Sequence, residues 1–379
     1  MERRRGQAIE LERAYLARAY ELAARAIADA SPNPPVGAVV VRDGRTLGEG
    51  YHHRCGEPHA EVEALLAARA GGADVRGATL YVSLEPCDHH GRTGPCTQAI
   101  LAAGIARVVA GTLDPNAVAG GGAARLRAAG VAVDVVDDSA ARALIERFAF
   151  ATAHAIPFVT LKMAMSLDGA IAPRPCGNYA VSGAPARELV RDLRYEYDAV
   201  MVGAGTIRAD DAQLTVRPHR TRRKPYVRVV VCENDAVPAH SRVFAAPPDA
   251  PAGAYAPTIV LAPAGIRERF TALETIADVV YVGPSAARTL DLAAALRALR
   301  ERDLCSVLCE GGPTLGGRLL EAHLVARIVW FIAPRFLQTP QAVPVLAGAD
   351  LTRAFDGWRF DRVERVGNDM LVSARVDRV

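Results

Sequence analysis

The feature that most constrains this fold is a regular alternation of short apolar runs with amphipathic stretches along the chain. The apolar runs are strand-length and the stretches between them have helical spacing. The first series has predicted strands at 36–41, 78–84, 107–111 and 131–136, and predicted helices at 8–30, 57–70, 96–103, 123–129 and 138–150. Strands that alternate with helices in this way form a sheet covered by helices, so we expect an α/β architecture.

A second series follows a boundary near residues 153–157, where a helix runs into a proline. Its predicted strands are 158–164, 199–203, 228–232, 258–262, 279–282, 306–309 and 327–333, and its predicted helices are 184–195, 291–301 and 314–322. The proline- and alanine-rich tract 236–257 is a predicted loop, and Asp43-Gly44 a predicted hairpin turn. We therefore expect two domains, residues 1–153 and 157–379.

Composition excludes several classes of protein. The chain has 379 residues, half of them hydrophobic, and a net charge of only +3, which argues against disorder and against a general affinity for nucleic acid. Because no apolar run is long enough to span a bilayer and no signal core follows the N-terminus, we expect a cytoplasmic protein without a membrane partner. Its seven cysteines are an odd number, which favours free thiols or metal ligands over a disulfide framework.

Three cysteine and histidine residues in the first series have the chemistry of a catalytic zinc site. His59, Cys87 and Cys96 supply one imidazole and two thiolates, which leave the fourth position of a tetrahedral Zn²⁺ open to water. Such a water loses its proton near neutral pH and becomes a nucleophile. Glu61 follows His59 in the first turn of a predicted helix and is placed to carry a proton to a leaving amine.

The pattern approaches the zinc-deaminase signature H-x-E…P-C-x-x-C but has eight residues between its two cysteines. This insertion must loop out, and its His89 and His90 are alternative ligands, although two cysteines already complete the set. The three donors could also be unrelated buried residues, since thiols are common in protein cores. Their combination with Glu61 and Pro86 favours the metal site.

Three segments of the first half, 31–37, 58–62 and 85–96, closely resemble the deaminase half of the bifunctional riboflavin-biosynthesis deaminase/reductase family. The resemblance implies a cytidine-deaminase-like α/β/α sandwich and a substrate that is a diaminopyrimidinone ribosylamine 5′-phosphate, which loses a ring amino group as ammonia. It also implies a substrate pocket lined by Asn33, His52, Arg92 and Thr93. Plainer roles for these residues are a turn-forming Asn33, a surface His52 and a solvated Arg92.

In the second half, glycine-containing turns lie between predicted strand ends and helix starts, at 203–206 and 310–315, together with the segments 162–169 and 209–217. Such turns let backbone N–H groups approach a phosphate. Taken singly, each is more often only a turn, and the absence of G-x-G-x-x-G argues against an ordinary Rossmann site.

In this order the second-half segments resemble the reductase half of the same family, a dihydrofolate-reductase-like α/β domain that uses NADPH. The implied NADPH contacts are Met165, Tyr179, Thr206, Asp210, Gly312, Pro313 and Thr314, and the implied substrate contacts are Gly177, Arg194, Leu214, Arg217 and Glu310. Hydride from the nicotinamide would reduce the ribosyl unit to a ribityl chain. Arg194 could instead be a solvated cation at the end of a helix.

Gly177, Tyr179 and Ala212 stand where this family usually has serine, tryptophan and proline. These three residues leave open the alternative that the chain is a paralogue with an active deaminase and a weakened or lost reductase, which serves a specialised pathway. The pattern also leaves room for a deaminase of tRNA bases, for a reductase half that is only a structural or dimerising module, and for a non-catalytic zinc scaffold. We expect one Zn²⁺ per chain, NADPH, a small pyrimidine ribosyl phosphate as substrate, no nucleic-acid partner, and a homo-oligomer, dimer or tetramer.

Overall fold

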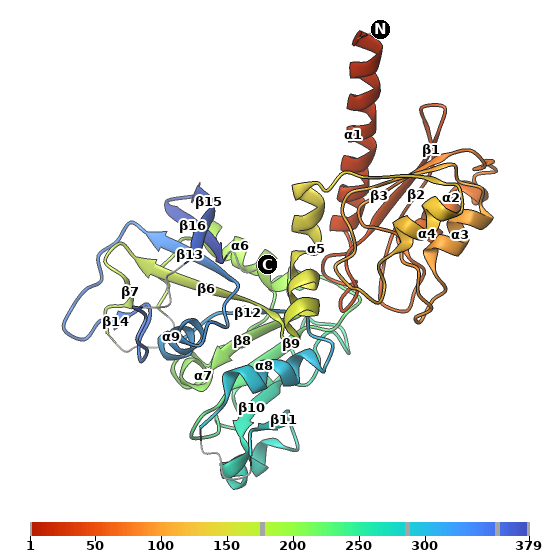
Figure 1. The fold of residues 1–379 in the computed structure, drawn as a ribbon. Coiled ribbons are helices and arrows are strands. Elements are labelled where there is room, and N and C mark those ends of the chain that lie inside the picture. Colours follow the sequence, from red (N-terminus) through yellow and green to blue (C-terminus); the bar gives the residue numbers. More distant parts are fainter. Residues whose placement is uncertain (1, 175–178, 285–288, 353–356, 377–379) are drawn as a thin grey trace. The chain divides into compact units, whose positions relative to one another are not determined.

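The computed structural model describes residues 2–174, 179–284, 289–352 and 357–376. The chain divides into two compact units, Met1–His154 and Ala155–Val379, each built on its own sheet (Figure 1). Among the described residues, no helix has both the length and the apolar character needed to cross a membrane.

The N-terminal unit contains a five-stranded sheet in the order β2-β1-β3-β4-β5. Its strands are β1 (Gly37–Arg42), β2 (Arg45–Tyr51), β3 (Thr79–Val82), β4 (Arg107–Ala110) and β5 (Ala132–Val135). Strand β1 pairs antiparallel with β2 and β3, while β3, β4 and β5 run parallel. The predicted turn at Asp43-Gly44 is confirmed, because both residues have positive φ, 52° and 73°, as tight hairpins of the favoured twist require.

Helices cover both faces of this sheet, which makes an α/β/α sandwich. They are α1 (Glu2–Ala24), α2 (Ala60–Ala70), α3 (Cys96–Ala102), α4 (Gly122–Ala128) and α5 (Ser139–His154). Successive side chains of a strand point to opposite faces. Val39 of β1 therefore packs with Leu16 and Leu22 of α1, whereas its neighbour Val40 packs with Ile100 of α3.

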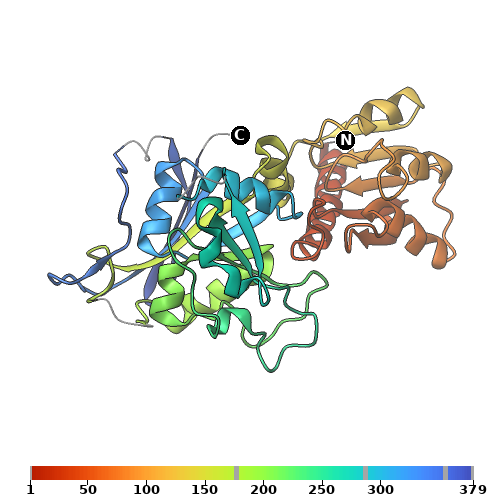
Figure 2. The same cartoon turned by 90° about the horizontal axis from the view of Figure 1, so that it is seen from below.

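The C-terminal unit contains a nine-stranded sheet in the order β11-β10-β9-β8-β12-β6-β13-β16-β15 (Figures 1 and 2). Its strands are β6 (Phe158–Ser166), β8 (Ala199–Gly203), β9 (Val227–Val231), β10 (Ile259–Pro263), β11 (Asp278–Val282), β12 (Ser306–Cys309), β13 (Arg327–Ala333), β15 (Trp358–Val366) and β16 (Asp369–Val376). The strands from β11 to β13 are parallel, and β16 and β15 continue the sheet antiparallel.

The remaining elements of this unit pack around that sheet. They are the helices α6 (Ala184–Glu196), α7 (Ala204–Asp210), α8 (Leu292–Arg300) and α9 (Pro313–Glu321), the short 3-10 helices η1 (Arg242–Phe244), η2 (Ala264–Arg269) and η3 (Thr271–Leu273), and the paired strands β7 (Ala170–Ala172) and β14 (Val343–Pro344). The carboxyl ends of parallel strands meet at one edge of a sheet, which is where ligands bind in α/β proteins. Strands β6, β8 and β12 therefore bring their ends together.

The predicted strands and helices match most of these elements, and the differences lie in their bounds and in elements that were not predicted. The first helix ends at Ala24 rather than at residue 30, and the second begins at Ala60 rather than at residue 57. Helix α7, the C-terminal hairpin of β15 and β16, the short strands β7 and β14 and the 3-10 helices were not predicted, and η1 lies within the predicted loop 236–257. The turn before β2 was predicted, but no range was given for that strand. Strand β15 lies at the sheet edge with most residues exposed, so its sequence lacks the apolar alternation that marks a half-buried strand.

Candidate active sites

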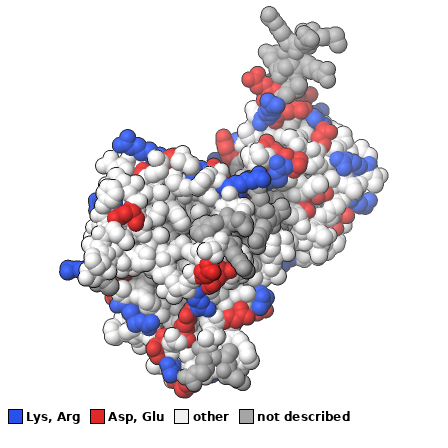
Figure 3. Space-filling view, turned by 60° about the vertical axis from the view of Figure 1, so that its left-hand side comes forward, with Lys and Arg blue, Asp and Glu red and all other residues white. Residues whose placement is uncertain are grey.

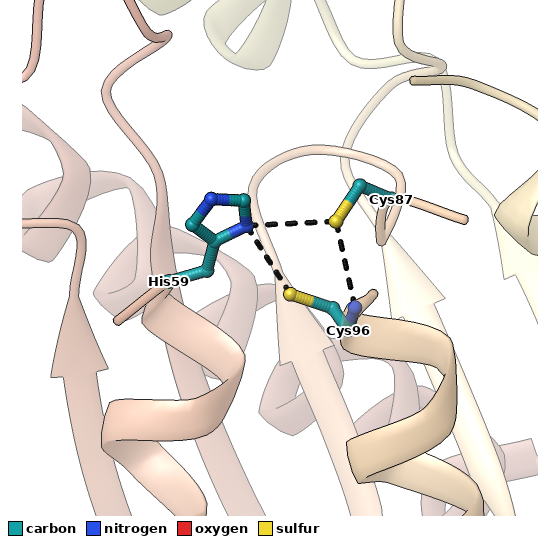
Figure 4. A group of neighbouring side chains, drawn as sticks. All are labelled: His59, Cys87 and Cys96. Carbon is teal, nitrogen blue, oxygen red and sulfur yellow. Dashed lines mark hydrogen bonds between the residues drawn. The ribbon is translucent and has the colours of Figure 1, made fainter. Parts of the chain in front are cut away.

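The three predicted metal ligands come together in the N-terminal unit (Figure 4). His59 is the N-cap of α2, Cys87 follows β3, and Cys96 is the first residue of α3. The Nδ1 atom of His59 lies 3.5 Å from Sγ of Cys87 and 3.3 Å from Sγ of Cys96. Among the described residues, the group of donor atoms found close enough to share a metal contains neither His89 nor His90.

These distances fit a zinc ion. Zn–N and Zn–S bonds of ordinary length in a tetrahedral site place nitrogen and sulfur about 3.6 Å apart, close to both measured separations. A hydrogen bond from the Cys96 thiol, with the nearby His59 ring, lowers the pKa of Cys87 to about 4, and the same hydrogen bond raises the pKa of Cys96. Zn²⁺ binds thiolates and would displace the proton that the two sulfurs share, so one imidazole and two sulfurs suit Zn²⁺ with one position open.

Glu61 lies beside the three donors in the first turn of α2 and is 3% exposed. Burial raises the pKa of its carboxyl group to about 7. A carboxyl group with this pKa can both accept and donate a proton near neutral pH, which is the property required of a proton carrier.

A cavity of about 310 Å³ opens over these residues, and all four predicted substrate-pocket residues line it. The Nδ2 atom of Asn33 lies 3.0 Å from Nε2 of His52, and the Thr93 hydroxyl lies 3.3 Å from Nε2 of His59. His52 is 2% exposed, and burial lowers its pKa, which favours a neutral ring at pH 7. Arg92 is exposed at the cavity wall.

Sequence reasoning missed part of this cavity. Asp114 and Asn116, from the segment between β4 and α4, also line it, as do His89 and Phe148. Burial raises the pKa of Asp114 to about 6. Asp114, Asn116 and Phe148 carry no motif spacing relative to His59 or Cys87, so only the fold brings them to the site, whereas His89 lies two residues after Cys87. Their one sequence signal is the polar, glycine-rich character of the connecting segment.

The C-terminal unit has a larger cleft of about 1040 Å³ beside the ends of β6, β8 and β12. Ten of the predicted reductase residues line it, namely Tyr179, Arg194, Thr206, Asp210, Leu214, Arg217, Glu310, Gly312, Pro313 and Thr314. Met165, near the end of β6, is not among the lining residues. Gly177 lies outside the described residues.

Arg194 points inward from α6 and pairs with Glu310, so it is not a solvated cation. The guanidinium group contacts both carboxylate oxygens, with Nη2 at 2.9 Å from Oε2, and Nη1 donates to the Thr215 carbonyl at 2.8 Å. Burial alone would raise the pKa of Glu310, but Arg194 outweighs it and the pKa is lowered. Lys162, which sequence reasoning did not select, places Nζ 4.0 Å from the same carboxylate, and burial lowers its pKa.

The turn before α9 fits a phosphate group of a dinucleotide. Gly312 is the N-cap of α9 and lines the cleft, and a Cβ atom there would lie 3.3 Å from Oγ1 of Thr206. Gly311 has φ of 90°, a conformation that favours glycine. Free N–H groups at a helix N-terminus, approached closely through glycine, form an anion site.

Comparisons with known proteins find a family match for each unit. One family model, the RibD C-terminal domain, matches residues 157–372, and another, the cytidine and deoxycytidylate deaminase zinc-binding region, matches residues 9–112. The riboflavin biosynthesis protein RibD of Escherichia coli K12 is 37% identical over 371 residues, which cover 94% of this chain and 97% of that protein. This chain belongs to the RibD family. RibD of Aquifex aeolicus is 36% identical over 96% of this chain and 98% of its own.

Solved structures extend the RibD likeness to the whole fold. A diaminohydroxyphosphoribosylaminopyrimidine deaminase/5-amino-6-(5-phosphoribosylamino)uracil reductase from Thermotoga maritima superposes with a TM-score of 0.83 at 35% identity, covering 97% of this chain and 99% of that one. Acinetobacter baumannii RibD gives a TM-score of 0.81 at 29% identity, with the same coverage.

The expected fold class is confirmed, with a cytidine-deaminase-like domain followed by a RibD reductase domain. The chain is a bifunctional enzyme of riboflavin biosynthesis, a hydrolase and an oxidoreductase, and its cofactors are Zn²⁺ and NADPH. The alternative of a paralogue with a lost reductase, serving another pathway, is not favoured.

Proposed function

We propose that residues 1–153 deaminate 2,5-diamino-6-ribosylamino-4(3H)-pyrimidinone 5′-phosphate and that residues 157–379 reduce the ribosyl unit of the product to a ribityl chain. The observation that carries the deaminase assignment is the His59, Cys87 and Cys96 donor set beside buried Glu61, in a cavity that His59, Glu61 and Cys87 line. The activities named for the Thermotoga maritima relative support the same pair of reactions.

In the deaminase site, bound zinc supplies a water molecule of lowered pKa as the nucleophile. Glu61 accepts the proton of this water and delivers it to the leaving amino group, which departs as ammonia. Asn33 and His52 hold the polar edge of the pyrimidine ring, and Thr93 lines the cavity beside them. Arg92, exposed at the wall, offers its charge to the 5′-phosphate.

In the reductase site, NADPH supplies the hydride. The turn at Gly312, Pro313 and Thr314 holds the cofactor phosphates, and Thr206 and Asp210 from α7 also line the cleft. Gly177 is a proposed substrate contact, and Tyr179 and Met165 complete the proposed cofactor contacts; Met165 and Gly177 rest on the family resemblance alone. These residues hold the nicotinamide against the ribosyl carbon.

The substrate contacts of the reductase divide into two kinds. Arg217, exposed in the cleft wall beside Leu214, binds the 5′-phosphate. Glu310 accepts hydrogen bonds from sugar hydroxyls, and Arg194 keeps it ionised and fixed in place. Lys162, which also lines the cleft, is a second cation beside the Glu310 carboxylate.

We also propose that the protein acts in the cytoplasm as a homo-oligomer, dimer or tetramer, without a nucleic-acid partner. The near-balanced charge argues against a nucleic-acid partner, and acidic and basic side chains are interspersed over the face seen in Figure 3. Nucleic-acid-binding proteins instead gather basic residues on one face. Light scattering on the purified chain measures the oligomeric state.

The test follows ammonia release and NADPH oxidation separately in the zinc-loaded protein. Glu61→Gln is expected to slow ammonia release by roughly 10²–10⁴-fold, to keep its zinc, and to oxidise NADPH normally when given the deaminated product. Glu63→Gln is the matched control, since Glu63 lies on the same helix turn but is not among the cavity-lining residues. Purified protein that binds no zinc, or releases no ammonia, would overturn the deaminase assignment.

A further inference from the structure

Glu85 is a buried acid that the mechanism above does not use. It lines the deaminase cavity and begins the metal-binding segment, residues 85–96. It lies two residues before Cys87 and is 6% exposed. A buried carboxylate is unfavourable unless hydrogen bonds compensate for the lost water. Here Oε1 accepts the backbone N–H of Ala123 at 2.9 Å, and Oε2 accepts that of Asp114 at 3.1 Å. Each oxygen therefore has a partner from one neighbouring segment.

That segment, residues 112–123, runs from the end of β4 into the first turn of α4 and supplies Asp114 and Asn116 to the deaminase cavity. Its shape is set locally, because Oδ1 of Asp114 accepts the N–H of Asn116 at 2.8 Å and Oδ1 of Asn116 accepts that of Val118 at 3.0 Å. The two hydrogen bonds to Glu85 attach this segment at Asp114 and Ala123, on either side of the cavity-lining Asn116. Glu85 thus fixes both ends of the part that faces the substrate.

Backbone hydrogen bonds also join the two segments. The Glu85 N–H donates to the Thr112 carbonyl at 2.9 Å, and the Asp88 N–H donates to the Ala119 carbonyl at 3.1 Å. The approach is closest at Gly122, where a Cβ atom would lie 1.7 Å from the Pro86 carbonyl oxygen. The metal-binding and cavity-lining segments therefore touch directly, and Glu85 supplies their side-chain link.

We propose that Glu85 is a positioning residue of the deaminase site, which holds Asp114 and Asn116 at a fixed place relative to the zinc donors so that they meet the polar groups of the substrate. This inference rests on the deaminase function proposed above. Glu85 differs from Glu61 because its oxygens accept backbone N–H groups, so it acts through the segment that it holds and carries no proton in the reaction.

Glu85→Gln tests this role with almost no change in size. Glutamine keeps one acceptor oxygen but turns an NH₂ group toward the second backbone N–H, so one charge-assisted hydrogen bond is lost. Loss of a bond of this strength is expected to raise KM for the pyrimidine phosphate by about tenfold or more, with kcat changed far less and zinc content unchanged. Hydrogen exchange is expected to accelerate at the amides of Asp114 and Ala123 and not across the rest of the unit.

Glu49→Gln is the matched control, because Glu49 lies in the same unit and pairs with Arg18 instead of with the cavity segment. It should leave KM and the exchange of residues 112–123 at wild-type values. Wild-type exchange protection of the buried strand β1 reports that the deaminase unit of each variant is folded. If the glutamine variant does not fold, Glu85→Asp keeps the charge with a shorter reach and is expected to shift KM and exchange in the same direction.

Wild-type KM and wild-type exchange in Glu85→Gln would overturn the inference, as would loss of zinc, which would assign Glu85 to the metal segment alone. Failure of the wild-type protein to release ammonia would instead overturn the proposed function. In that case the exchange rates of residues 112–123 still decide whether Glu85 holds the segment.

Discussion

Replacing Arg194 with methionine tests whether the buried pair with Glu310 supports the reductase unit. The two side chains are only 17% and 8% exposed, and they join α6 to the end of β12. Methionine keeps much of the apolar contact of the arginine stem but removes the charge and the hydrogen bonds. The Glu310 carboxylate then stays buried, with Lys162 Nζ at 4.0 Å as its nearby cation.

The size of the effect follows from that geometry. Removing one partner of a buried ion pair costs about 3–5 kcal/mol, because the other charge is left without compensation. Lys162 retains part of the attraction, so we expect the lower end, about 3 kcal/mol. For a unit of this size each kcal/mol lowers the melting temperature by about 2–4 °C, which gives a fall of about 6–12 °C.

The pH dependence has a defined sign. Burial opposes ionisation of Glu310, but Arg194 lowers its pKa below the usual glutamate value. The ion pair therefore contributes its full stability above the unfolded pKa of about 4.3, and this contribution is lost as the pH falls through the lower folded value. The difference in stability between wild type and Arg194→Met is expected to be largest near neutral pH and to shrink in acid.

Calorimetry on the full chain, with ammonia release and NADPH oxidation measured on the same samples, checks these expectations. Arg194→Met should lower the reductase transition and NADPH oxidation while leaving ammonia release intact. Arg194→Lys keeps the charge without the two-pronged contact, so its melting temperature and its NADPH oxidation should fall less than those of Arg194→Met. A methionine variant that unfolds at the wild-type temperature, or a lysine variant that loses as much as methionine, would refute the reasoning.

Three further predictions concern the metal, the core and the cofactor turn. Removing zinc with a chelator should abolish ammonia release and spare NADPH oxidation, as measured by metal analysis and both assays. Added Zn²⁺ should restore ammonia release in the wild type but not in Cys87→Ser. Leu80→Ala removes a fully buried side chain from the deaminase core and should destabilise that unit by about 2–5 kcal/mol in denaturant unfolding, with reductase stability unchanged. Gly312→Ala adds a Cβ atom 3.3 Å from Thr206 Oγ1 and should weaken NADPH binding in a fluorescence titration, whereas unchanged affinity would place the cofactor phosphates elsewhere.

The deaminase pocket was more accessible to sequence reasoning than the reductase cleft. Asn33, His52, Arg92 and Thr93 lie within short stretches that also carry the metal ligands, and the structure brings all four to one cavity. Asp114 and Asn116 were missed because backbone and side-chain contacts of the folded unit bring their segment to the cavity, and no motif spacing marks them. In the reductase unit, Met165 was expected to contact the cofactor, yet it is not among the residues that line the cleft.

The sequence by itself determined the α/β alternation, the hairpin at Asp43-Gly44 and the identity of the zinc donors with Glu61. These features depend on local periodicity and on rare residue types at short spacing, which the chain carries whatever its neighbours in space are. Only the tertiary structure decided that Arg194 faces Glu310, 116 residues away, instead of solvent. The physical reason is the order of the strands: β12 lies between β6 and β8, so Glu310, just after β12, lies close to Lys162 of β6 and to Arg194 of α6. The spacing of these residues along the sequence does not predict these contacts.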